Sequence, residues 1–119
     1  MTVVRRAVGA WGERHAVQHL IDCGWRVVAR NWRCRLGEID IIAFDGETLV
    51  FCEVKTRRGF AFGPPAEAVV AAKARRLRRL AAQWLASNPI HPREIRFDVL
   101  SVSMRRDAPA EIEHIRGAF

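Results

Sequence analysis

GEIDIIAFDGETLVFCEVK, residues 37–55, is the stretch that decides the fold. Two runs rich in Ile, Val and Phe lie on either side of Asp45-Gly46, and this pattern is a strong signal for a tight β-hairpin. If Asp45 and Gly46 form a two-residue turn, Phe44 lies opposite Glu47 and the strands pair outward from there. The stretch therefore predicts two antiparallel strands at the centre of the fold.

The sequence on both sides of this hairpin predicts helices and further strands. An apolar stripe of Ala16, Val17 and Leu20 indicates a first helix, which Gly24 would end in a left-handed conformation. The expected elements are a helix over 9–23, a strand from residue 25, the hairpin, a loop over 56–65, a helix over 66–86, a strand over 95–102 and a last short strand within 112–119. This order predicts an α/β protein with a mixed sheet flanked by helices.

Charged side chains gather on one face of the predicted hairpin. Successive side chains of a strand alternate between faces, so Glu53 and Lys55 point the same way, and Asp40 lies diagonally across from Glu53. Glu38 joins them, and three carboxylates repel one another unless a cation lies between them. Mg²⁺ or Mn²⁺ held by Asp40 and Glu53, with Lys55 acting on a water molecule, would suit hydrolysis of a phosphodiester. A solvated sheet face with a structural ion pair has the same spacing.

Glu13 lies on the stripe of the first helix that should face the sheet. It shares that stripe with Ala16, Val17 and Leu20. A carboxylate in such a position is costly unless it is paired or bound to a metal. We therefore expect Glu13 either to join the metal ligands or to lie at the rim, hydrogen-bonded to an Arg.

The charge balance favours a polyanionic partner. Twenty Lys and Arg oppose 13 Asp and Glu, and all but Lys55 and Lys73 of the twenty are Arg, which pairs bidentately with phosphate. Five basic residues fall within 73–79, where Lys73 lies closer to the core and the arginines point outward, either to bind phosphates or as a solvated face. The expected nucleic-acid contacts are Arg57, Arg58, Lys73, Arg75, Arg76, Arg78 and Arg79.

Length and composition exclude several other classes of protein. The 119 residues suit one compact domain over 1–119. No apolar stretch is long enough to span a bilayer, and the N-terminus lacks the apolar core of a signal peptide, so we expect a cytoplasmic protein with no membrane partner. Three scattered Cys residues without a CxxC pair indicate neither a zinc ribbon nor a disulfide framework.

Four motifs together resemble the bacterial YraN family, which is assigned to the restriction-endonuclease-like, Holliday-junction-resolvase-like fold. They are GERHA at 12–16, NWRCRLGEIDIIA at 31–43, VFCEVKTR at 50–57 and FGPPAEAV at 62–69. The resemblance implies a three-layer core, with a mixed central sheet flanked by helices, and a nuclease site of the PD-(D/E)xK type. By position, Asp40 matches the first metal carboxylate, Glu53 and Lys55 match the (D/E)xK pair, and Glu13 matches a helix glutamate of junction resolvases. Ile39 stands where the superfamily motif has Pro.

The resemblance and the residues lead to the same functional expectation. It is a Mg²⁺- or Mn²⁺-dependent endonuclease that acts on structured or branched DNA, with Asp40, Glu53 and Glu13 as metal ligands and Lys55 as a further catalytic residue. A homodimer fits this function, because a junction offers two strands to be cut. The alternatives are a non-catalytic nucleic-acid-binding module with the nuclease fold and, less favoured, a protein-interaction domain whose basic face meets an acidic partner.

Overall fold

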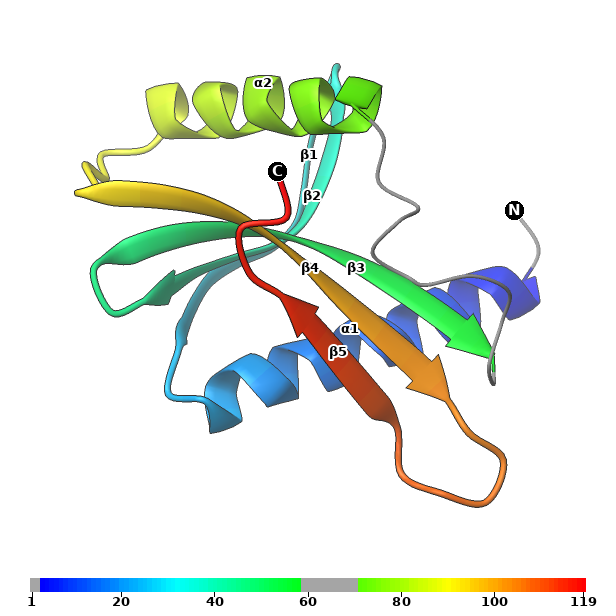
Figure 1. Ribbon diagram of the computed structural model, residues 1–119. Coiled ribbons are helices and arrows are strands. Elements are labelled where there is room, and N and C mark those ends of the chain that lie inside the picture. Colours follow the sequence, from blue (N-terminus) through cyan, green and yellow to red (C-terminus); the bar gives the residue numbers. More distant parts are fainter. Residues whose placement is uncertain (1–2, 59–70) are drawn as a thin grey trace.

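A computed structural model describes residues 3–58 and 71–119 (Figure 1). One five-stranded sheet, with strand order β1-β2-β3-β4-β5, forms the middle of the molecule. β3 and β4 are parallel, and the other neighbouring strands are antiparallel. The elements are α1 (Val3–Asp22), β1 (Arg26–Cys34), β2 (Gly37–Asp45), β3 (Thr48–Arg58), α2 (Ala71–Ser87), β4 (Glu94–Met104) and β5 (Glu111–Ile115).

The two helices cover opposite faces of the sheet, as Figure 1 shows, and each face has its own buried cluster. The cluster on the α1 face includes Ala16, Leu20, Ile41, Val50, Cys52 and Leu100. The cluster on the α2 face includes Ile42, Leu49, Phe51, Leu80 and Trp84. The predicted α/β class, the mixed sheet with flanking helices and the order of elements are confirmed.

The first helix begins earlier than the sequence pattern indicated. α1 starts at Val3 rather than near Gly9, because no Pro interrupts residues 3–8 and a helix interior tolerates one Gly. Its end is as predicted: Gly24 has a φ of 86°, and the N–H of Trp25 donates to the carbonyl of Leu20. The part of the predicted second helix over 66–70 lies outside the described residues.

The strands of the central hairpin pair in a register that differs from the predicted one by two residues. Phe44 pairs with Leu49 instead of Glu47, and the turn residues are Gly46 and Glu47. Gly46 has a φ of 61°, which suits a Gly at the first rather than the second central position of the turn. Because the register differs by an even number of residues, every side chain keeps its predicted face.

β3 is longer than predicted, which corrects the placement of two arginines. Residues 56–58 were expected in a loop, but Arg57 pairs with Ser103 and Arg58 with Met104 in the parallel ladder with β4. Both therefore occupy strand positions. The hairpin pattern gave no sign of this extension, since the pairing partner is more than 40 residues away in the chain.

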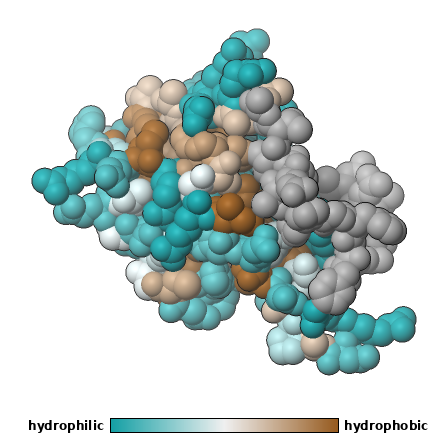
Figure 2. Space-filling model, viewed as in Figure 1, coloured by the Kyte–Doolittle hydropathy of each residue, from teal (hydrophilic) through white to brown (hydrophobic). Residues whose placement is uncertain are grey.

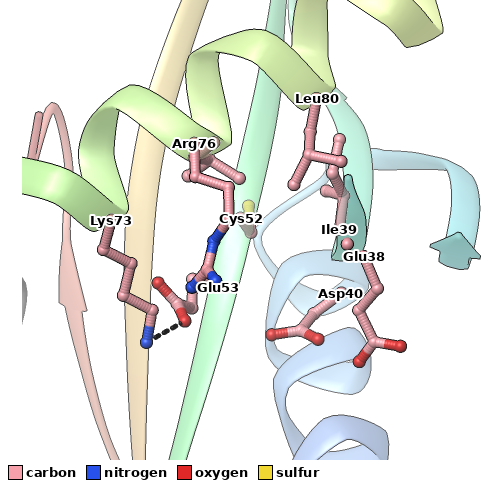
Figure 3. Close-up of a pocket in the computed structure, with 10 residues that line it drawn as sticks. Glu38, Ile39, Asp40, Cys52, Glu53, Lys73, Arg76 and Leu80 are labelled. Atoms are coloured by element: carbon pink, nitrogen blue, oxygen red, sulfur yellow. Dashed lines mark ion pairs between the residues drawn. The ribbon is translucent and has the colours of Figure 1, made fainter. Parts of the chain in front are cut away.

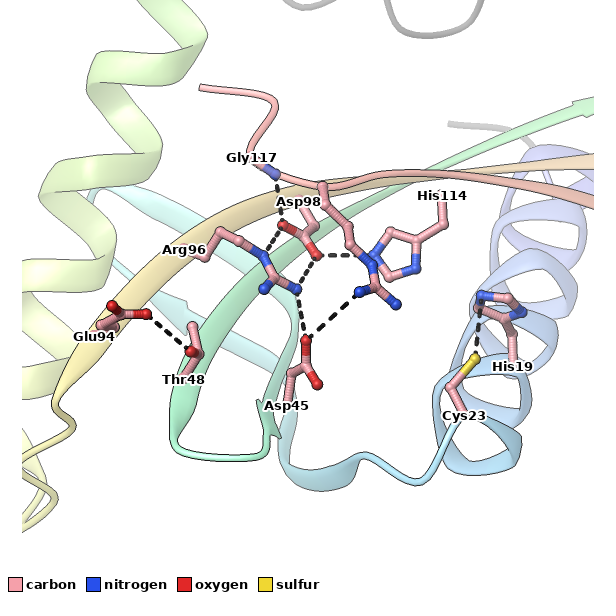
Figure 4. Close-up of polar contacts among 10 residues, drawn as sticks. His19, Cys23, Asp45, Thr48, Glu94, Arg96, Asp98, His114 and Gly117 are labelled. Atoms are coloured by element: carbon pink, nitrogen blue, oxygen red, sulfur yellow. Dashed lines mark hydrogen bonds and ion pairs between the residues drawn. The ribbon is translucent and has the colours of Figure 1, made fainter.

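A polar network ties β4, β5 and the C-terminus together (Figure 4). Asp98, which is 0% exposed, accepts hydrogen bonds from Arg96, His114 and the backbone N–H of Gly117. Burial alone raises the pKa of Asp98, but these hydrogen bonds outweigh it and hold the pKa at about 2. Asp98 is therefore a structural partner of Arg96.

The surface agrees with the composition. Figure 2 shows hydrophilic side chains over much of one face, with hydrophobic ones in patches between them. Within residues 3–58 and 71–119, no helix has the length and apolar character needed to cross a bilayer.

Candidate functional site

The candidate site lies where β2 and β3 separate. Their pairing ends at Ile41 and Cys52, after which β2 stays with β1 near α2 while β3 continues beside β4 (Figure 1). One residue beyond this point, the Asp40 carboxylate accepts a hydrogen bond of 2.8 Å from the backbone N–H of Val54. Asp40 thus satisfies a strand N–H that the ladder leaves without a partner.

Asp40 and Glu53 share the face of the sheet that α2 covers. Glu53 follows Cys52 of the α1-side cluster, so alternation points it to the other side. Asp40 lies between Ile41 of that cluster and Ile39 of the α2-side cluster, and it lines the pocket beneath α2 together with Glu53. Continuing the observed register by one residue places Asp40 directly opposite Glu53 rather than diagonal to it. Lys55 is two positions further along the same face of β3. The predicted grouping of Asp40, Glu53 and Lys55 on one face is therefore confirmed.

A pocket of about 270 Å³ separates these strands from α2 (Figure 3). Glu38, Asp40 and Glu53 line it from the sheet, and Lys73 and Arg76 line it from the helix. Apolar parts of the lining come from Ile39, Cys52, Leu77 and Leu80. The pocket thus combines acidic side chains on one wall with basic side chains on the other.

The carboxyl group of Asp40 has a pKa well above the usual value for aspartate. Burial is the main cause that raises its pKa, and the charges of Glu38, Glu53 and Glu13 raise it further, to about 7. The hydrogen bond from Val54 acts in the opposite direction but is outweighed. Positive charge placed beside Asp40 would favour its ionised form.

The chain has only two lysines, and both lie beside Glu53. Lys73 Nζ is 2.5 Å from Glu53 Oε1, so Lys73 points toward the sheet and lies at the site. A side-chain hydrogen bond with Lys73, followed by burial, lowers the pKa of Lys55. In a chain with 18 Arg residues, the two compact ammonium groups are placed together in this pocket.

Glu13 lies near the site but is held by β1. Its carboxylate accepts a 2.7 Å hydrogen bond from Asn31 and lies 3.6 Å from Arg30 Nε, which matches the expected placement at the rim beside an Arg. Its charge still contributes to the raised pKa of Asp40. Within residues 3–58 and 71–119, no three His, Cys, Asp or Glu side chains are grouped to hold a metal. Glu13 as a direct metal ligand therefore stays a prediction.

A close helix–strand contact positions Glu13. The Cα of the preceding residue, Gly12, approaches Thr56 of β3 so closely that a Cβ there would overlap the threonine side chain. Only Gly permits α1 to lie this near to β3. Gly12 therefore fixes the distance between Glu13 and the carboxylates of the hairpin.

Asn31 is a site residue that the sequence reasoning missed. Its neighbours Arg30 and Trp32 pair with Ile41 and Ile39, so Asn31 lies across from Asp40. It is the only non-Gly residue with positive φ (51°) among the described residues, a conformation that Asn tolerates better than most residues. An Asn inside an otherwise strand-like run was the available signal.

The predicted nucleic-acid contacts come from α2 and from the end of β3. Arg75, Arg76, Arg78 and Arg79 are all exposed, as expected of an outward helix face. Arg76 lines the acidic pocket, and Arg75, Arg76 and Arg79 also line a second hollow. Arg78 instead lies over the ring of Phe97, 5.7 Å from its centre. Arg57 and Arg58 occupy positions on β3, where Arg57 is partly buried.

The donor set can be tested against the metal that the sequence suggests. Mg²⁺ binds oxygen ligands and commonly uses one or two protein carboxylates, completing its shell with water and substrate phosphate. Asp40 and Glu53 supply such a pair, and the nearby carboxylates of Glu38 and Glu13 add negative charge around Asp40. The pair fits one hydrated divalent ion, provided that Glu53 exchanges Lys73 for it.

Comparison with known proteins gives a consistent match. Residues 12–102 match the uncharacterised protein family UPF0102, and this range contains every candidate site residue above. A UPF0102 protein of Frankia casuarinae is 56% identical over 95% of this chain and 96% of its own length. A UPF0102 protein of Beutenbergia cavernae is 57% identical over 93% of this chain and 94% of its own. One of Nocardia farcinica is 51% identical over 97% and 91%.

Proposed function

This chain belongs to the uncharacterised protein family UPF0102, which confirms the resemblance to the YraN family, and we propose that it is a metal-dependent endonuclease with a restriction-endonuclease-like core. The proposed substrate is structured or branched DNA, and the cofactor is Mg²⁺ or Mn²⁺. One observation carries the proposal: Asp40 is a buried carboxyl beside Glu53, and its hydrogen bond comes from a backbone N–H rather than from a basic side chain.

The residues of the pocket suit hydrolysis of a phosphodiester. Asp40 and Glu53 would hold the divalent ion, which when bound stabilises negative charge on the phosphate oxygens. In its neutral form, which its lowered pKa favours, Lys55 orients the attacking water and accepts its proton. The water oxygen bonds to phosphorus while the leaving oxygen departs with the bonding electrons and takes a proton from solvent. Lys73 releases Glu53 and is then free to pair with a phosphate oxygen.

The charge of the protein supports nucleic acid as the substrate class. The net charge is +7, and exposed arginines of α2 adjoin the acidic pocket. This arrangement would draw a polyanion toward carboxylates that repel it in the absence of a metal. A cytoplasmic location and a homodimer that cuts both strands of a junction belong to the same proposal.

The ion pair between Lys73 and Glu53 favours one alternative. Glu53 is engaged by a lysine in the structure, so the pocket can be neutralised without a metal. A non-catalytic nucleic-acid-binding module with the same core would need only this ion pair, and no metal, to neutralise the pocket. The two functions differ in one consequence, which is cleavage.

Incubation of the purified protein with a panel of DNAs tests the proposal. The panel contains a four-way junction, a flap, a duplex and a single strand, each with Mg²⁺, Mn²⁺ or EDTA. We expect metal-dependent cleavage of a branched substrate that is lost in the variant Asp40→Asn/Glu53→Gln. Binding without cleavage on the whole panel would support the module instead.

A further inference from the structure

The second hollow gives the proposed substrate a path along α2. It has a volume of about 350 Å³ and is lined by Leu36, Ala72, Arg75, Arg76 and Arg79. Resting on the proposed function, we propose that this hollow is a subsite for a DNA phosphate next to the phosphate bound in the acidic pocket. We call it the arginine subsite and define it by these five residues.

The arginine subsite and the acidic pocket adjoin each other. Arg76 lines both of them. The helical residues of the subsite, at positions 72, 75, 76 and 79, follow the spacing of a single helical stripe, and the small side chain of Ala72 leaves room between the guanidinium groups. A DNA strand whose one phosphate lies at Asp40 and Glu53 therefore meets Arg76 first and the rest of the stripe next.

Among the residues that the structure describes, no side chain neutralises the charges of the subsite. Of the described residues that line it, none is acidic. Other arginines of the described chain form ion pairs, such as Arg33 with Glu38 and Arg93 with Glu47. Within the same residues, the three guanidinium groups of the subsite form no ion pair. Guanidinium groups bind phosphate bidentately, so the hollow has the charge and the donors that a phosphodiester needs.

An exposed apolar side chain distinguishes a nucleic acid from a free phosphate ion. Leu36, in the turn between β1 and β2, is 45% exposed and forms a wall of the hollow. Some DNA-binding proteins insert apolar side chains such as Leu between base steps. A small anion would gain nothing from Leu36, whereas a strand would contact it beside the arginines.

Arg78 provides a matched control on the same helix. It is exposed and carries the same charge as Arg79, but it lies over Phe97 and does not line the subsite. Loss of Arg78 changes the net charge as much as loss of Arg79 does. A difference between the two variants therefore reports position and not overall charge.

The test is binding of a fluorescent four-way junction by anisotropy, in EDTA so that no cleavage takes place, over a range of salt concentrations. Each phosphate contact contributes roughly 0.9 to the slope of log affinity against log salt. We expect Arg79→Gln to lower the slope by about 0.9 and Arg75→Gln/Arg79→Gln by about twice that, while Arg78→Gln should lower it clearly less than Arg79→Gln does. Leu36→Ser should weaken binding several-fold without a change of slope.

Equal losses in Arg78→Gln and Arg79→Gln would overturn the subsite, because net charge alone would explain them. Absence of DNA binding by the wild type would also overturn it. Displacement of the junction by millimolar inorganic phosphate from the wild type, with no effect of Leu36→Ser, would identify the hollow as a site for free phosphate. Failure of the proposed function would give a different result. The variants would change the salt dependence of binding in EDTA as expected, but the wild type would not cleave DNA in Mg²⁺.

Discussion

Lys73 of α2 reaches across the pocket and places its ammonium nitrogen 2.5 Å from Oε1 of Glu53 on β3 (Figure 3). The contact joins β3 to the helix of the crossover that connects the parallel strands β3 and β4. Both side chains are mostly shielded from solvent, at 23% and 16% exposure. A lysine thus provides positive charge at Glu53. Burial and the neighbouring carboxylates raise the pKa of the other carboxyl group, Asp40.

Lys73 and a divalent ion should therefore compete for Glu53. We expect Lys73→Met to lower the Mg²⁺ or Mn²⁺ concentration needed for half-maximal thermal stabilisation by several-fold, because Glu53 is then free to bind the ion. Arg78→Met removes a positive charge outside the pocket and should have little effect. Unchanged or weaker metal binding in Lys73→Met would show that the ion pair does not occupy the metal position.

Metal binding at Asp40 and Glu53 should be visible as stability. Ligand at a hundred times its dissociation constant adds about 2.7 kcal/mol to the free energy of unfolding, so Mg²⁺ or Mn²⁺ should raise the Tm of the wild type. Asp40→Asn/Glu53→Gln should remove this gain. Equal metal-induced shifts of Tm in the two proteins would place any metal site elsewhere.

The raised pKa of Asp40 predicts a pH-dependent effect of Asp40→Asn. Since the folded protein holds the proton up to about pH 7, whereas the unfolded chain releases it near pH 4, wild-type stability falls as pH rises between these values. Asn does not titrate and still accepts the hydrogen bond from Val54. In EDTA, urea unfolding should show a relative gain for Asp40→Asn that grows from pH 4 to pH 7, by at most about 4 kcal/mol. A pH-independent difference would contradict the pKa.

The contact between Gly12 and Thr56 predicts opposite effects of two similar substitutions in α1. Gly12→Ala should destabilise the protein by roughly 1–3 kcal/mol, because the new methyl group overlaps Thr56. Gly9→Ala meets no neighbour and should stabilise the helix by up to about 1 kcal/mol. Urea unfolding measures both. Equal stabilities would mean that α1 does not approach β3 as described.

The alternation of residues along the hairpin was enough to place Asp40, Glu53 and Lys55 on one face. The faces were predicted correctly although the turn residues were not, because a shift of the pairing register by two residues leaves every side chain on the same face. The position of Gly46 in the turn depends on backbone twist, which the Asp-Gly pair alone does not determine.

The parts that escaped prediction depend on distant contacts. The separation of β2 from β3 after Ile41 and Cys52 and the extension of β3 to Arg58 follow from pairing with β1 and β4. The hydrogen bond between Asn31 and Glu13 joins two residues that are 18 positions apart in the chain, and no local pattern indicates it. The sequence located Lys73 near the site but not its partner, because helix position relative to a sheet is set by packing.

Lys55 tests the central claim, that this pocket hydrolyses DNA, most directly. The measurement compares single-turnover cleavage of a branched DNA in Mg²⁺ or Mn²⁺ with binding of the same DNA in EDTA, for the wild type and Lys55→Ala. We predict that Lys55→Ala binds within a few-fold of the wild type but cuts about 10²–10⁴ times more slowly, the usual value of a group that moves a proton. Equal cleavage by both proteins, or no cleavage by the wild type of any DNA in either metal, would contradict the account.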